Sequence, residues 1–362
     1  MINFIEKYRI KYTLFSFLIL QILVHSVYGF TFKTGIQEDF EIVKQLNEGV
    51  LTTKNYSADS PFYHIGAFLL NIDNFENYLI FISFLSFFVQ FLIIYKISFL
   101  KNNSLLFIST GWVVTSAWYV GNTDILVVLL TLYLYDAVNK DSFEWFKILL
   151  LTSLLTFSHY GLALFVILSI GILLIDSRKK FLVPIFIFGY LLGRTIIQLY
   201  LNYFNFSGRS RLRFLFNDNV LNDTFNLTST FFLKIIISGF LGIILVLFFV
   251  IYKNSVKDNF KIYISLASSI IATSISLDSS RVFSIIIIPL IYYLIYQYTN
   301  NENYNNTNLI SSLPFLIFIL SIIIGEQHVY GVIHFESPNN MEPSLYNIFS
   351  TKINSLMKNI WP

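Results

Sequence analysis

Long apolar segments separated by short polar ones run through the whole of this 362-residue chain. Within each segment the apolar residues are continuous and do not alternate with period two, so the pattern predicts helices and excludes the strands of a membrane barrel. Many segments approach the length needed to cross a hydrocarbon core about 30 Å thick. The pattern predicts about eleven membrane-spanning helices, at residues 13–30, 77–95, 104–119, 122–138, 147–158, 161–175, 182–202, 231–252, 262–277, 282–298 and 309–325.

The four segments between residues 104 and 175 form two pairs, which are interrupted by polar residues at 121–122 and at 158–161. Each segment is short for a full crossing, whereas each pair is too long for one comfortable helix. We therefore interpret both pairs as hairpins whose tips lie below the outer surface of the membrane. Polar backbone at that depth requires protein or a water-filled cavity around it.

Composition supports a membrane location for the chain. It is 55% hydrophobic and only 12% charged, which is too little charge to cover the surface of a soluble protein of this size. A net charge of +3 is too small to indicate a nucleic-acid partner. Cysteine is absent, which excludes disulfides and cysteine-ligated metals. We predict an all-α, polytopic transmembrane helical bundle, with the lipid bilayer as one partner.

The distribution of lysine and arginine predicts the orientation in the cell membrane. Four of the five connections on one side carry Lys or Arg, which favours the cytoplasmic side. We expect residues 13–30 to be retained as a first helix with the N-terminus in the cytoplasm, because no small-x-small cleavage site follows. Residues 1–180 then form one module with a first outer loop at 31–76, within which we expect Phe62 to Leu70 to form a short interfacial helix after Pro61. Residues 181–362 form a more variable module with an outer loop at 203–230 and an outer C-terminal tail.

Under this topology most of the unusual polar residues lie on the outer side, and one arginine lies within a span. Polar groups next to hydrocarbon are costly, so a cluster on one side indicates a shared hydrated cavity. The residues are Glu38, Asp39, Asp59, Asn122, Asp124, His159, Tyr160, Arg209, Arg211, Arg213, Asp278 and Arg281, with Arg194 inside a span.

The acidic residues have both chemical and structural interpretations. Asp39 is a candidate general base, with Glu38 or Asp59 holding a partner or a metal ion. The alternative is a solvated loop carboxylate. Asp124, two residues after Asn122, either lines the cavity or caps the helix that begins there.

The basic residues also have two interpretations each. His159 contacts a phosphate or a sugar, or serves as a hydrogen-bonding group at a helix break. Arg281 has a planar fork that suits a phosphate, or it anchors its helix at the interface beside Asp278. Arg194 requires a partner such as a carboxylate or a lipid phosphate, because it lies within a span. The loop that begins at Arg209 attracts an anionic headgroup or is simply solvated.

Three motifs occur in order in the first half of the chain: Gln37-Glu38-Asp39-Phe40 after the first span, Ser60-Pro61-Phe62-Tyr63, and Gly121-Asn122-Thr123-Asp124 at the first hairpin. Together they resemble the first outer loop and a hairpin tip of the GT-C superfamily, the integral-membrane glycosyltransferases that use polyprenyl-phosphate-linked sugars. The resemblance covers most of residues 1–180 and is looser afterwards, where Arg281 precedes an apolar run containing Pro289.

This resemblance implies a GT-C-like fold and transfer of a sugar from a polyprenyl-phosphate donor to a glycan, lipid or protein acceptor on the outer face. It also implies that Asp39, or else Glu38, acts as the base. The chain departs from the family at Ser158-His159-Tyr160, where many members carry a lysine, which leaves the donor-phosphate contact open.

A divalent cation also remains open under this resemblance, and no other cofactor is expected. Two further functions remain as alternatives: a polysaccharide polymerase of the Wzy/EpsG type, and a non-catalytic transporter of lipid-linked saccharides. The transporter is disfavoured because the sequence has no visible internal repeat.

Overall fold

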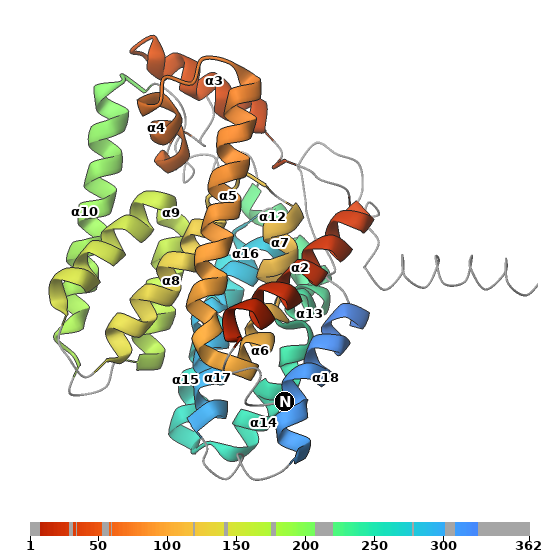
Figure 1. Cartoon of the computed structure of the whole chain (residues 1–362). Helices are drawn as coiled ribbons and strands as arrows, with labels where there is room; N and C mark the ends of the chain where they lie inside the picture. The colour runs from red at the N-terminus through yellow and green to blue at the C-terminus, as the bar shows by residue number, and fades with distance from the viewer. Residues whose placement is uncertain are drawn as a thin grey trace, which may run out of the picture.

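The computed structural model describes residues 8–28, 32–33, 35–52, 58, 60–118, 120–140, 144–174, 179–206, 220–276, 279–300 and 308–324. This part of the chain is helical and has no strand beyond one isolated parallel bridge (Figure 1). The helices are α2 (Arg9–Tyr28), α3 (Ile36–Asn47), α4 (Phe62–Leu69), α5 (Phe75–Ile97), α6 (Ser104–Ile108), α7 (Gly111–Trp118), α8 (Asp124–Asn139), α9 (Trp145–Leu174), α10 (Leu182–Tyr203), α12 (Val220–Thr230), α13 (Phe232–Phe240), α14 (Ile244–Lys253), α15 (Val256–Ser274), α16 (Ser279–Ile286), α17 (Ile288–Asn300) and α18 (Asn308–Ile324), with 3-10 turns at Ser98–Asn103 and Leu241–Ile243.

Several of these helices could cross a membrane, as the hydrophobic pattern predicts. Four are long and apolar enough by themselves, and a fifth candidate is a pair bent by 43°. Helix α5 exposes Phe84, Phe88 and Phe91 along its outer face, as expected of a surface that contacts lipid tails. The candidates are Phe75–Ile108, Trp145–Leu174, Leu182–Tyr203, Phe232–Lys253 and the bent pair Ser279–Ile286 with Ile288–Thr299.

Helix α9 reverses direction at His159, where the sequence predicts a hairpin tip. The backbone of His159 is not helical, with φ −163° and ψ 89°. Lys179, five residues beyond α9, donates hydrogen bonds to the carbonyls of Val138 and Asn139, just before α9 begins. Gly189 and Gly193 of α10 pack in parallel on Thr152 and Thr156, which places Leu182, the first residue of α10, near Trp145 at the start of α9. The chain from Leu174 to Leu182 spans at most about 29 Å, whereas a straight helix of this length would hold its ends about 45 Å apart. The two halves of α9 therefore fold back on one another.

Helix α10 packs closely against the first half of α9 because glycines face the contact. A Cβ atom added at Gly189 would lie 2.8 Å from Cβ of Thr152, and one added at Gly193 would lie 2.7 Å from Cβ of Thr156. Small residues spaced by four let two membrane helices approach in this way. The two segments run in the same direction, so Arg194, which follows Gly193, lies at the level of the α9 reversal.

Helices α3 and α4 cover one end of the bundle, which we name the capped end (Figure 1). The short helix predicted after Pro61 is confirmed as α4. Helix α3 lies within the segment predicted as the first outer loop, and it was not among the predicted helices. Its apolar face buries Phe40 and Val43 against α4 and α5, and Ile42 and Leu46 against α10. Helix α3 therefore joins two long helices across the capped end.

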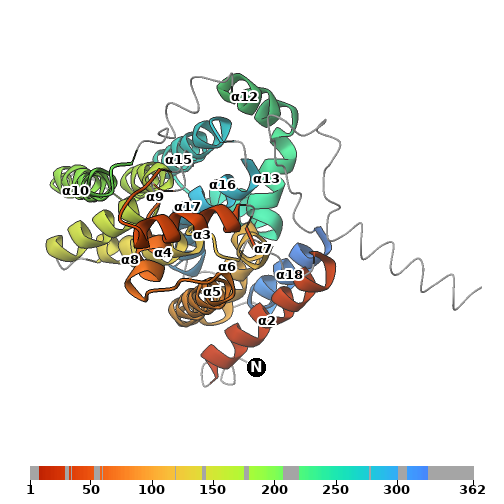
Figure 2. The ribbon, with the colours of Figure 1, turned by 90° about the horizontal axis from the view of Figure 1, so that it is seen from above.

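The centre of the bundle is built from both halves of the chain. Helices α16 and α17 are buried among α7, α8 and α9, as the view along the bundle shows (Figure 2). Tyr292 of α17 and Tyr135 of α8 meet edge to face, with ring centroids 4.9 Å apart. One apolar core thus joins the predicted modules 1–180 and 181–362.

The turn between α7 and α8 depends on Gly121, which has φ +94°. A Cβ atom there would lie 2.5 Å from Cγ2 of Ile82 and 3.2 Å from Cδ1 of Ile36. Gly49 provides a matched control, since its φ is +78° but its surroundings are open. We expect Gly49→Ala to cost about 1 kcal/mol from backbone strain alone. We expect Gly121→Ala to cost ~2–4 kcal/mol, because steric overlap adds to the strain. Thermal unfolding in detergent compares the two, and equal losses would contradict the close packing at Gly121.

Candidate functional site

The segment that precedes α3, predicted to belong to the first outer loop, is attached to the tip of the α7–α8 turn by backbone contacts. Phe32 and Val120 form the isolated parallel bridge, and the N–H of Lys33 donates to the carbonyl of Val120 at 3.0 Å. The contact fixes where α3 begins, because Ile36 starts that helix only three residues later. As a result, the charged residues of the loop lie beside the residues of the turn.

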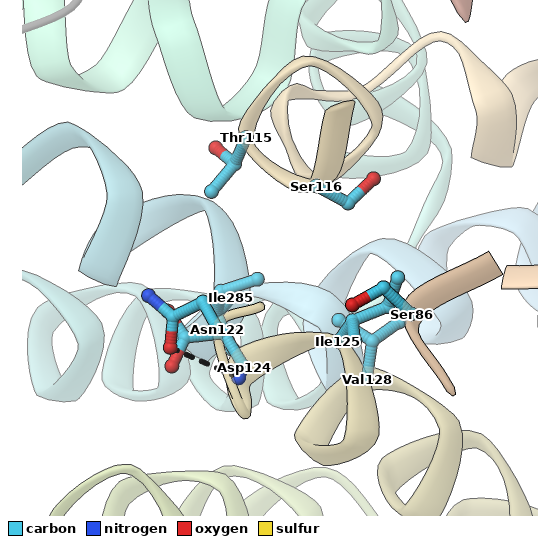
Figure 3. Close-up of a pocket in the computed structure, with 8 residues that line it drawn as sticks. All are labelled: Ser86, Thr115, Ser116, Asn122, Asp124, Ile125, Val128 and Ile285. Atoms are coloured by element: carbon cyan, nitrogen blue, oxygen red, sulfur yellow. Dashed lines mark hydrogen bonds between the residues drawn. The ribbon is translucent and has the colours of Figure 1, made fainter. Parts of the chain in front are cut away.

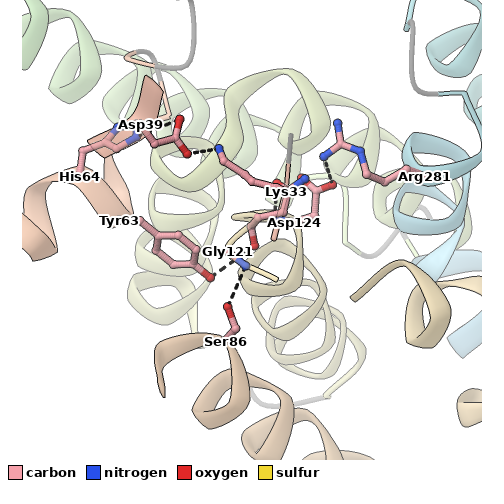
Figure 4. Close-up of polar contacts among 9 residues, drawn as sticks. Lys33, Asp39, Tyr63, His64, Ser86, Gly121, Asp124 and Arg281 are labelled. Carbon is pink, nitrogen blue, oxygen red and sulfur yellow. Dashed lines mark hydrogen bonds and ion pairs between the residues drawn. The ribbon is translucent and has the colours of Figure 1, made fainter. Parts of the chain in front are cut away.

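Asp39 is buried on α3, with 2% of its surface exposed, and lies between two basic side chains. Lys33 Nζ forms an ion pair with its Oδ2, and His64 Nε2 lies 3.5 Å from its Oδ1 (Figure 4). Burial by itself raises the pKa of Asp39, but the charge of Lys33 and the hydrogen bond from His64 outweigh it. The pKa of Asp39 is therefore below its usual value, and the carboxylate is ionised at neutral pH.

Asp124 and Arg281 form a second buried ion pair, between residues 157 positions apart in the chain. Arg281 Nη1 donates to Asp124 Oδ2 at 2.8 Å, and Asp124 is 2% exposed. Asp124 is the first residue of α8, and its side chain does not cap that helix, whose N-cap is Thr123. The capping alternative for Asp124 is therefore wrong. Arg281 has Asp124 as a partner, whereas Asp278 lies outside the described residues.

Two further polar contacts form at the turn between α7 and α8, close to the ion pairs (Figure 4). The hydroxyl of Tyr63 donates to the carbonyl of Asn122 at 3.4 Å, and the N–H of Gly121 donates to Ser86 Oγ at 3.2 Å. Burial first, and then the nearby charge of Asp124, raise the pKa of Tyr63 above its usual value. Tyr63 therefore remains a protonated hydrogen-bond donor beside the turn.

A small cavity, about the size of one water molecule, lies between α5, α7, α8 and α16 (Figure 3). Polar groups from three different segments border it, and apolar side chains complete its wall. Asp124 lines this cavity and Asp39 does not. The lining residues are Ser86, Thr115, Ser116, Asn122, Asp124, Ile125, Val128 and Ile285.

A separate polar group forms where α9 and α10 meet. The guanidinium of Arg194 lies over the ring of Tyr160, with 4.2 Å from Cζ to the ring centroid. Arg194 Nη1 is buried and has no hydrogen-bond partner within the described part of the chain. His159 Nδ1 accepts a hydrogen bond from the N–H of Leu162 at 3.2 Å, which is the structural role proposed as one alternative. The cation–π contact with Tyr160 partly stabilises the charge of Arg194 within the bundle.

The remaining predicted site residues are not part of this cluster. Glu38 is exposed on α3, one position before the buried Asp39. The other predicted residues, Asp59, Arg209, Arg211, Arg213 and Asp278, lie outside the residues that the structure describes.

Sequence reasoning missed Lys33 and gave His64, Tyr63 and Ser86 no role at the site. Lys33 carried a usable signal: it follows the first span on the predicted outer side, where positive charge is disfavoured. Tyr63 ends the Ser60-Pro61-Phe62-Tyr63 motif, but the motif assigned it no role. Ser86 had no signal, since a helical serine is common in membrane bundles.

The cluster supplies two kinds of chemistry. Two carboxylates can accept a proton, and Lys33 and Arg281 can stabilise a developing anion. Among the described residues, no group of three or more His, Asp or Glu side chains is close enough together to hold a metal ion. Comparison of the chain with protein-family models, curated proteins and solved structures gives no match.

The lowered pKa of Asp39 predicts a pH-dependent contribution to stability. A depressed folded-state pKa stabilises the fold above the unfolded pKa, about 3.9, and this stabilisation is lost as the pH falls through the folded value. We therefore expect wild type to be more stable than Asp39→Asn at neutral pH, and the difference to shrink below about pH 4. Thermal unfolding in detergent across this range measures it. Glu41→Gln, at an exposed ion pair with Lys44, is the control and should show little difference. A stability difference between wild type and Asp39→Asn that does not vary with pH would contradict an ionised Asp39 paired with Lys33.

Proposed function

We propose that this protein is a GT-C-like membrane glycosyltransferase, which transfers a sugar from a polyprenyl-phosphate donor to an acceptor on the outer face of the membrane. One observation carries the proposal: two carboxylate–cation pairs, from segments far apart in sequence, are largely buried near one another at one turn of a mostly apolar bundle. Ionised groups in such surroundings are costly, and they mark functional sites by default.

The proposed topology has about eleven crossings, with the N-terminus in the cytoplasm and the C-terminal tail outside. It is supported by lysines gathered at the end of the bundle opposite the capped end, among them Lys96, Lys140, Lys179 and Lys253. The crossings would be α2, α5, α6 with α7, α8, the two halves of α9, α10, α13 with α14, α15, α16 with α17, and α18.

The lengths of two segments support a site below the outer surface. Helix α8 has 16 residues and would rise about 24 Å, and the first half of α9 is of similar length. Both fall short of a core about 30 Å thick. Asp124, Tyr160 and Arg194 would then lie several ångströms below the outer surface, where the phosphate of a lipid-linked sugar would sit beside them.

The chemistry of the proposed reaction matches the groups in the cluster. The donor already has a phosphate leaving group, so catalysis needs a base for the acceptor hydroxyl and positive charge for the departing phosphate. Arg281 and Lys33 offer the charge, and Asp39 and Asp124 offer the carboxylate. Arg281 suits phosphate because its planar guanidinium binds two oxygens at once.

A polysaccharide polymerase of the Wzy/EpsG type is the second candidate, and Arg194 is the observation that favours it. Its guanidinium with Tyr160 forms a basic group apart from Arg281. An enzyme with two lipid-phosphate substrates needs two such groups, whereas a transferase with one lipid-linked donor needs one.

Cysteine labelling tests the topology in this cysteine-free chain. Glu48, at the end of α3, and Lys257, in the first turn of α15, are both exposed. We expect a membrane-impermeant maleimide to label Glu48→Cys on intact cells, and Lys257→Cys only after permeabilisation, because only α3 lies at the outer face. The unmodified chain is the control. Labelling of Lys257→Cys on intact cells, with Glu48→Cys protected, would invert the topology and remove the site from the outer face.

Purified protein incubated with a panel of polyprenyl-phosphate sugars tests the function. We expect transfer to an added glycan or lipid acceptor, with Arg281→Lys impaired in the use of donor, because an ammonium lacks the bidentate fork. Lengthening of a lipid-linked saccharide by repeat units would favour the polymerase. Movement of the lipid-linked saccharide across the membrane of vesicles that contain the protein, without any covalent product, would overturn both enzymatic proposals.

A further inference from the structure

The two buried carboxylates of the cluster differ in what surrounds them. Asp39 lies between Lys33 and His64, and neither of its neighbours borders the cavity. Asp124 lines the cavity together with Ser86 and Asn122. The resemblance implies Asp39 as the base, yet the carboxylate that faces space for a reacting group is Asp124.

We propose that Asp124 is the catalytic base and that the cavity beside it receives the attacking hydroxyl group of the acceptor; this rests on the proposed glycosyltransferase function. The cavity has room for about one water-sized group, and a hydroxyl group is no larger than a water molecule. Ser116 and Asn122 on its wall offer hydrogen bonds that orient the hydroxyl, and Ile125 and Val128 exclude bulk water.

The proposed transfer step uses Asp124 for the proton and Arg281 for the charge of the leaving group. The acceptor O–H gives its proton to a carboxylate oxygen of Asp124, and its oxygen forms a bond to the anomeric carbon of the donor. The bond from that carbon to the phosphate oxygen breaks, and its electron pair leaves with the phosphate. Arg281, 2.8 Å from Asp124 Oδ2 at the start, then faces a neutral carboxyl group and a donor phosphate whose negative charge has increased by one.

This exchange keeps the net charge of the buried site constant. Before the step the positive Arg281 faces an ionised Asp124, and afterwards it faces a phosphate beside a protonated Asp124. Moving charge within a preorganised pair avoids creating an uncompensated charge in a low-dielectric site. Asp39 is then a positioning residue, which fixes Lys33 and the start of α3 against the turn that carries Asp124.

Asp124→Asn, Asp39→Asn and Asp136→Asn test the inference in the transfer assay. Asp136 is the matched control, since it lies on the same helix and is also ion-paired, with Lys96 at the other end of the bundle. We expect Asp124→Asn to lower kcat by about 100- to 10,000-fold, with KM for the donor changed by much less. Asp136→Asn should leave kcat near wild type. Asp39→Asn should retain at least about a tenth of kcat and lose mainly thermal stability, because proton acceptance is not its role.

Three outcomes decide the question. Loss of kcat in Asp124→Asn with retention in Asp39→Asn supports the inference, whereas the reverse order overturns it and restores Asp39 as the base. If wild type transfers no sugar from any donor, the proposed function fails first, and the inference fails with it.

If Asp124→Asn does not fold, Asp124→Glu provides a second test, because it keeps a carboxylate that can pair with Arg281. The longer side chain displaces the carboxylate by about one methylene, which should lower kcat at least about tenfold without a matching loss of stability. A wild-type kcat in a folded Asp124→Glu protein would overturn the inference.

Discussion

Pairing of buried charges is the constraint on which the arrangement of this bundle depends. Arg281 of α16 and Asp124 of α8 are largely removed from solvent, and separating them would leave two costly, uncompensated ions. Helices that are far apart in the sequence therefore have to meet at this point. The pair of Lys33 and Asp39 imposes the same requirement on the first loop, which has to stay against the bundle.

Two backbone irregularities make this meeting possible. Gly121 has a positive φ that lets the chain turn from α7 into α8 beside Ile82, which places Asp124 next to Arg281. His159 leaves the helical conformation within α9, so the chain turns back and Tyr160 faces Arg194. Both irregularities lie within apolar surroundings, where exposed backbone polar groups are tolerated only if protein encloses them. Local breaks and buried charges therefore occur at the same level of the bundle.

The sequence predicts much of the helical frame and little of the site. Continuous apolar runs reveal the helical segments, Pro61 reveals the start of α4, and the polar break at His159 reveals the reversal of α9. The partner of Arg281 could not be predicted, because side-chain pairing between distant helices leaves no periodic pattern. Helix α3 was not predicted, because its many charged residues make the segment resemble a polar loop although Ile36, Phe40 and Val43 have helical spacing. Lys33 was missed because a single lysine next to a span resembles an ordinary interfacial residue.

The central claim is that the first loop is attached to the turn before α8, and cross-linking measures this most directly. Phe32 and Val120 form a parallel bridge, and bridged residues lie about 5 Å apart, within the range that a disulfide spans. In this cysteine-free chain, Phe32→Cys with Val120→Cys should form an intramolecular disulfide in native membranes under mild oxidation. Phe32→Cys with Glu48→Cys, at the far end of α3, should not. Failure of the first pair to cross-link, or equal cross-linking of both pairs, would contradict the attachment and the buried site built on it.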